Sequence, residues 1–218
     1  MGPLFPPGST QYTCTASVID SPTGDLLITA AHCLSGTGAG WRFVPGYDDG
    51  TEPYGSWTIV GLYGPRAWLD ATTSSSDYVI AEVAPRVLGG KEQSVQGAVG
   101  ANRLATAPTT GATVTVPAYA IGDKHPLTCT ARVSYQGVYP AFICNPYVGG
   151  TSGAPWLEQV RGATTVVGVI GGLHQGGCFP ATSYSAPFDG TTLAVAASAA
   201  QGATPSVLPP APSDGCSP

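Results

Sequence analysis

Glycine and proline interrupt this chain so often that they restrict it to short elements joined by turns. There are 30 glycines and 21 prolines among the 218 residues. The runs between them are rich in valine, threonine and tyrosine, which favour the pleated surface of a sheet. This pattern favours an all-β fold over a helical bundle. The length allows one large β-domain or two small barrels that share a core.

Six cysteines without any C-x-x-C pair indicate disulfides rather than a zinc or thioredoxin-type site. Disulfides imply an oxidising compartment, so we expect a secreted, extracellular protein. No run reaches the roughly 18 apolar residues of a membrane helix. The first residues lack the basic region and long apolar core of a signal peptide, as in a mature chain. A net charge of −5 gives no reason to expect nucleic acid or a membrane as a partner.

A serine between glycines is the first feature that points to chemistry. Ser152 lies within residues 149–155 and follows an apolar run. Glycines on both sides let the backbone turn sharply and keep the nearby amides free of side-chain bulk. A serine nucleophile needs such amides, because backbone N–H groups hold the oxyanion of acyl transfer. The alternative is an ordinary glycine-rich turn between strands, so a catalytic function requires a base elsewhere.

Of the three histidines, His32 has the setting that best fits a general base. It ends a strand-like run over residues 27–31, with two alanines before it and Cys33 after it. The alanines leave room for the ring, and a disulfide at Cys33 would fix its backbone, as a rigidly held base requires. We interpret His125 as part of an exposed turn. His174 is loop-like and could border a cleft.

A buried carboxylate that orients this imidazole is expected at Asp77. It stands where a serine-rich loop enters the strand-like run 78–83. A carboxylate is costly to bury unless it is paired, and an imidazole N–H would pair it and fix the tautomer of the ring. The alternative is a local turn bond at the end of the loop. Asp70 is the weaker candidate, because no alternating apolar run follows it closely.

Three motifs, at residues 29–33 (TAAHC), 77–80 (DYVI) and 150–155 (GTSGAP), together resemble those of the chymotrypsin-like, trypsin-fold serine proteases, especially compact bacterial secreted members. The resemblance covers roughly residues 14–188. It implies an all-β fold of two six-stranded antiparallel β-barrels with the active site between them, in one domain spanning 1–218. The expected parts are an N-terminal barrel at 12–84, a connection at 85–110, a C-terminal barrel at 111–190, and a short helix with a proline-rich tail at 191–218. Residues 1–11 are expected to form a surface arm.

The resemblance also implies the role of each residue in a secreted serine endopeptidase. His32 would be the general base, Asp77 its orienting carboxylate and Ser152 the nucleophile. The amides of Gly150 and Ser152 would form the oxyanion hole. Thr151 stands where trypsin-like members have the Asp that pairs with a new N-terminal amine. We therefore expect a site that forms without this activation step.

A polypeptide substrate would bind to this fold as an added strand. The residues that match this role are Ile170, Gly171 and Gly172, and Pro146 matches the pocket floor. Because no carboxylate stands at that floor, an apolar or small side chain is the default preference. His174 near the groove raises the alternative of acidic substrates.

The resemblance further implies a disulfide between Cys14 and Cys33 that braces the histidine. Cys129 and Cys144 lie on adjacent strand-like runs and are plausible partners, which leaves Cys178 with Cys216. We expect no cofactor, no metal and a monomer, and we interpret the acidic turn at residues 48–52 as a solvated loop. Two alternatives remain open: a silent protease-like domain that binds peptides or surfaces, and a disulfide-braced β-domain without an active site.

Overall fold

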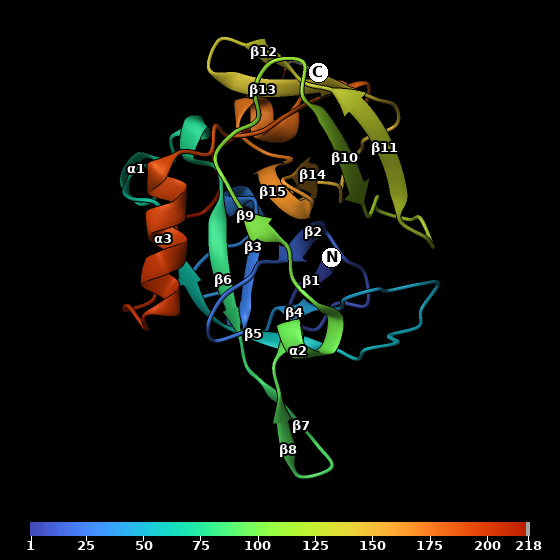
Figure 1. Cartoon of the computed structure of the whole chain (residues 1–218), viewed down its shortest axis with the longest axis vertical. Coiled ribbons are helices and arrows are strands. Elements are labelled where there is room, and N and C mark those ends of the chain that lie inside the picture. Colours follow the sequence, from blue (N-terminus) through green and yellow to red (C-terminus); the bar gives the residue numbers. More distant parts are fainter. Residues whose placement is uncertain (217–218) are drawn as a thin grey trace.

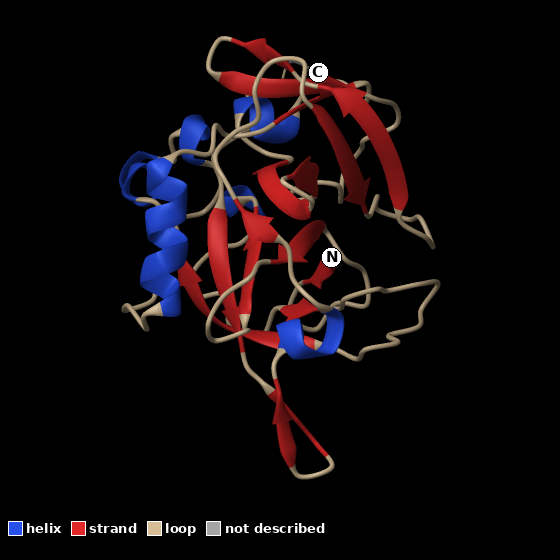
Figure 2. Ribbon diagram, in the orientation of Figure 1, coloured by secondary structure: helices blue, strands red, loops and turns tan. Residues whose placement is uncertain are grey.

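A computed structural model describes residues 1–216, and strands dominate it (Figure 2). Six strands of the N-terminal half form a closed barrel in the order β1-β2-β3-β6-β5-β4. All neighbouring pairs are antiparallel. Trp57, Phe43 and Leu27 are fully buried inside it. The strands are β1 (Gly2–Phe5), β2 (Cys14–Val18), β3 (Leu26–Thr29), β4 (Arg42–Phe43), β5 (Trp57–Tyr63) and β6 (Val79–Val83).

Strand β1 shows that the expectation of a surface arm at residues 1–11 was wrong for residues 2–5, whereas residues 6–11 are partly or largely exposed. All four of its residues are buried, and it pairs with both β2 and β4. The strand therefore closes the barrel. The prolines and glycines around Leu4 and Phe5 hid its apolar pattern, because such residues usually mark turns or strand edges.

The C-terminal half contains two sheets, and a second closed barrel is not confirmed among the described residues. One sheet has the order β11-β10-β14-β15-β9 and the other β12-β13-β16. The two sheets meet near β15 and β16 through a side chain. Val169 N–H at the end of β15 donates to Ser185 Oγ at 3.1 Å, where a continuous sheet would have a backbone carbonyl. The strands are β10 (Thr113–Ala118), β11 (Leu127–Arg132), β12 (Ser134–Gln136), β13 (Tyr139–Ile143), β14 (Pro155–Val160), β15 (Ala163–Val169) and β16 (Thr182–Tyr184).

The connection at residues 85–110 is more structured than its composition predicts. Strands β7 (Arg86–Leu88) and β8 (Lys91–Gln93) form a hairpin that projects from the first barrel (Figure 1). Helix α2 (Val95–Val99) follows, and β9 (Arg103–Leu104) then joins the second half by pairing in parallel with β15. The segment thus contributes a strand to the second half.

The expected C-terminal helix is present as α3 (Gly190–Ala200), which runs beside β6 (Figure 1). Asp189 and Thr192 begin it with a capping box. The tail then crosses the first barrel, where Leu208 is buried and exchanges two backbone hydrogen bonds with Gly36. A second short helix, α1 (Arg66–Ala71), lies between β5 and β6. Within residues 1–216, every helix is too short or too polar to cross a membrane.

Candidate active site

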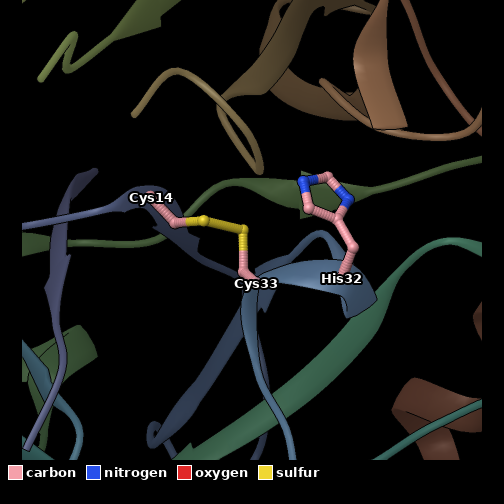
Figure 3. Close-up of side chains that lie close together, drawn as sticks. All are labelled: Cys14, His32 and Cys33. Atoms are coloured by element: carbon pink, nitrogen blue, oxygen red, sulfur yellow. A yellow bond between two sulfur atoms is a disulfide. The ribbon is translucent and has the colours of Figure 1, made fainter. Parts of the chain in front are cut away.

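His32 stands in the one-turn helix η1 (Ala31–Cys33), directly after β3. The Cys14–Cys33 disulfide lies beside it and ties this turn to the start of β2 (Figure 3). The backbone N–H of His32 donates to Asp77 Oδ1 at 2.9 Å, and its Nδ1 lies 2.7 Å from Asp77 Oδ2. Two bonds to one carboxylate fix both the backbone and the ring of this histidine.

Asp77 is fully buried between the turn η2 (Ser74–Ser76) and strand β6. Its third donor is Gly172 N–H, at 2.9 Å from Oδ2. Three donors offset the cost of removing a carboxylate from water. Asp70, the weaker candidate for this role, is instead a largely exposed partner of Arg66 on α1.

In the turn that carries Ser152, the backbone amides of Gly150 and Ser152 have no acceptor within the described part of the chain. Thr151, Gly153 and Ala154 each donate their N–H to a carbonyl of the protein. Among the described residues, the N–H groups of Gly150 and Ser152 have no such partner. Gly150 has a φ of 94°, a conformation that glycine adopts without strain. The turn therefore presents two donors free to bind an oxyanion.

A buried threonine of the first barrel holds this turn, and sequence analysis did not single it out. Thr15 N–H donates to Ser152 O at 2.8 Å, and Thr15 Oγ1 donates to Gly150 O at 3.0 Å. The same Oγ1 accepts from Tyr119 N–H at 3.0 Å. Only its position beside Cys14 could have drawn attention to it. Thr15 therefore links the two halves at the point where the serine and the amides lie.

A cleft of about 570 Å³ brings together His32, Ser152, Gly150, Ile170 and His174. Three residues expected to bind substrate do not line it. Pro146 is exposed and its neighbours Tyr147 and Val148 line the cleft in its place, whereas Gly171 and Gly172 are buried and are not among the lining residues. The reason is visible in their bonds, since Gly171 N–H donates to Tyr184 O and Gly172 N–H to Asp77.

One wall of this cleft is apolar, and its one buried phenol stays neutral. Burial raises the pKa of Tyr147 to about 12, and its hydroxyl donates to Val116 O. The apolar residues Val148, Ile170 and Phe179 also line the cleft. This region therefore suits an uncharged side chain of a ligand.

The three disulfides pair as predicted: Cys14–Cys33, Cys129–Cys144 and Cys178–Cys216. Two of them lie next to a histidine, giving the groups Cys14, His32, Cys33 and His174, Cys178, Cys216. Their sulfur atoms are already bonded to each other, so neither group has the free thiolates that a metal site of this kind needs.

Basic side chains pair with the acidic turn at residues 48–52. Glu52 pairs with Arg42, Asp49 with Lys124, and Asp48 with His125. These side chains are partly or largely exposed, so each pair contributes little to stability. The turn also links the two halves of the chain, because Lys124 and His125 follow β10.

The C-terminal tail reaches the cleft, which the sequence indicated only through Cys216. Gln175 Nε2 donates to Pro212 O at 2.6 Å, and His174 Nδ1 lies 3.0 Å from Asp214 O. Since a carbonyl can only accept, Nδ1 of His174 carries the proton. Both His174 and Gln175 have a φ of 52°, which is uncommon outside glycine. Their side chains hold the tail against the rim of the cleft.

Comparison with known proteins places the fold in a class. The serine protease AL20 from an extremophilic microorganism has a TM-score of 0.76 at 22% identity, over 92% of this chain and 96% of that one. The protease Anisep from Arthrobacter nicotinovorans has a TM-score of 0.75 at 24% identity, over 93% and 95%. A Glu endopeptidase has a TM-score of 0.69 at 17% identity, over 92% and 98%. The chain therefore has the fold of the chymotrypsin-like serine proteases.

Comparison of sequences gives only a short match. No protein-family model matches the chain. One curated relative, an extracellular metalloprotease of Bacillus subtilis (strain 168), is 27% identical over 78 residues. The match covers 34% of this chain and 24% of that protein, so the chain spans about a quarter of the length of this relative.

Proposed function

We propose that this protein is a secreted serine endopeptidase in which Ser152, His32 and Asp77 form a catalytic triad. The proposal rests on three groups that meet in one cleft: a base, a nucleophile and a pair of hydrogen-bond donors. A histidine fixed by a buried carboxylate and a serine both line it, next to two backbone amides that have no acceptor. The protease fold of the structural neighbours supports the same conclusion.

The mechanism follows from the tautomer of His32. Because Nδ1–H donates to Asp77, Nε2 is free to accept a proton. Ser152 Oγ attacks the peptide carbonyl as Nε2 takes the hydroxyl proton, and the new oxyanion binds the amides of Gly150 and Ser152. The C–N bond breaks as Nε2 protonates the leaving amine. Water then attacks the acyl-enzyme by the same route and restores the serine.

The cleft favours an apolar side chain before the scissile bond. Tyr147, Val148 and Ile170 line it, and no lysine or arginine does so among the described residues. The alternative preference for acidic substrates depended on His174. Its Nδ1–H is bonded to Asp214 O, which leaves only Nε2 for an acidic substrate. The glutamyl specificity in the name of the Glu endopeptidase is therefore not carried over to this chain.

A phosphonyl fluoride labelling experiment tests the proposal. We expect one adduct on Ser152 in the folded protein, none after denaturation, and peptide hydrolysis that is lost in Ser152→Ala. Ser206→Ala is a matched control on the tail, and this variant should keep both the labelling at Ser152 and the peptide hydrolysis. Labelling of another serine, or hydrolysis that survives Ser152→Ala, would contradict the assignment. Peptide binding without labelling or hydrolysis would instead support a silent protease-like domain.

A further inference from the structure

The tail at residues 212–216 borders the cleft, yet the mechanism above does not employ it. It is anchored on both sides: Leu208 is buried in the first barrel, and Cys216 is bonded to Cys178. Between these points, Pro212 O and Asp214 O accept the two side-chain bonds from Gln175 and His174. The tail is therefore a fixed part of the cleft rim.

The tail also closes a second space behind the cleft. A cavity of about 50 Å³ lies between Asp77, Trp68 and tail residues 212–214. The buried Nε1 of Trp68 has no hydrogen-bond partner among the described residues. A cavity of this size holds about one or two water molecules and is too small for a side chain of a substrate.

Asp214 is the residue of this wall that carries charge. It lines the 570 Å³ cleft, and it is the only Asp, Glu, Lys or Arg among the described residues that does so. One carboxylate oxygen, Oδ1, accepts from Cys216 N–H at 2.9 Å. No described Lys or Arg pairs with it. The cleft therefore has one fixed negative charge at this end, on a backbone held by a disulfide.

The geometry indicates which part of a substrate meets this charge. Ile170 O accepts from Gly153 N–H, next to the nucleophile, and the chain runs from there to His174 and the tail contact. Ser152, Ile170, His174 and Asp214 all line the same cleft. A peptide whose scissile bond lies at Ser152 and whose preceding residues pass Ile170 and His174 therefore comes within reach of Asp214. We propose that Asp214 selects a positively charged side chain there, two to four residues before the bond, an inference that rests on the proposed endopeptidase function.

The size of the effect follows from the exposure of Asp214. An exposed ion pair changes an affinity by up to about fivefold. A lysine in the substrate gains this attraction and a glutamate meets repulsion, so we expect the Lys-to-Glu ratio of kcat/KM to be about tenfold at one position. High salt should reduce the ratio, because the Debye length falls to about 3 Å at 1 M.

The test is a set of fluorogenic peptides with Lys, Gln or Glu at each of the four positions before the scissile bond. We expect Asp214→Asn to bring the ratio near one and Asp214→Lys to invert it. Glu92→Lys makes the same change of net charge on the distant β7–β8 hairpin and should leave the ratio unchanged. An unchanged ratio in Asp214→Lys overturns the proposal.

The experiment separates two kinds of failure. If the wild-type protein hydrolyses the peptides and is labelled at Ser152 but its ratio does not respond to residue 214, only the role of Asp214 is wrong. If the wild-type protein neither hydrolyses any peptide nor takes the label, the proposed function fails, and the specificity inferred from it fails as well.

Discussion

Replacing Thr15 with valine tests whether one buried hydroxyl holds the two halves together at the serine turn. Valine keeps the shape of threonine but removes Oγ1. Gly150 O then loses a donor and Tyr119 N–H loses an acceptor. Thr15 has no exposed surface, so water cannot replace either bond. Each unpaired buried group costs about 1–3 kcal/mol. We expect the free energy of unfolding to fall by about 2–6 kcal/mol for the two groups together.

Activity should fall as well, because Gly150 contributes one of the two free amides. Loss of an oxyanion donor costs about 10²–10³ in kcat, and a displaced donor costs part of that. We expect Thr15→Val to lower kcat at least tenfold with a smaller change in KM. Peptide hydrolysis and urea unfolding, measured on the same preparation, separate the loss of activity from the loss of stability.

Two matched variants control for other causes. Thr15→Ser keeps the hydroxyl and loses one methyl group, so it should cost about 1 kcal/mol. Thr130→Val breaks an exposed bond to Thr115 on the outer face of the second half and should change stability by less than about 0.5 kcal/mol. If Thr15→Val behaves like Thr130→Val in both assays, Thr15 does not have the role assigned to it.

Three further predictions concern single features of the fold. Gly153→Ala should prevent stable folding, seen as lost near-ultraviolet circular dichroism, because a Cβ there would lie 2.0 Å from Thr29 Oγ1 at a φ of 78°. Removing the Cys178–Cys216 disulfide, which spans 38 residues, should cost up to about 4 kcal/mol in urea unfolding; an unchanged midpoint would contradict this. Burial and the bond to Glu82 raise the pKa of Tyr63 to about 12. Its stabilising effect is complete below about pH 10 and is lost as the pH rises to about 12, so Tyr63→Phe should flatten the alkaline fall in stability.

The candidate site shows what a local sequence context can predict. Each of the three residues has neighbours that suit its expected role. His32 follows small residues, Asp77 precedes an apolar strand, and Ser152 lies between glycines. The structure places His32 and Asp77 in direct contact and brings Ser152 into the same cleft. Whether the three act as a triad remains a prediction until labelling is done.

The residues expected to bind substrate show what a local sequence context cannot specify. Gly171 and Gly172 are close to the correct place in the chain, but their N–H groups are already used by Tyr184 O and Asp77. Pro146 lies one residue away from the lining position at Tyr147. The local sequence indicates roughly where such residues lie in the chain. The hydrogen-bond partner of each backbone group depends on segments that are far away in the sequence.

The sequence by itself determined the short-strand β architecture, the presence of disulfides and the residue types available for acyl transfer, because each follows from neighbouring residues or from composition. Only the tertiary structure decided that β1 closes the first barrel, that the second half stays as two sheets, that Thr15 holds the serine turn and that Asp214 lines the cleft. These features depend on contacts between distant segments, such as Thr15 with Gly150, which lie 135 residues apart. The periodicity of a single segment carries no information about the partner it will meet.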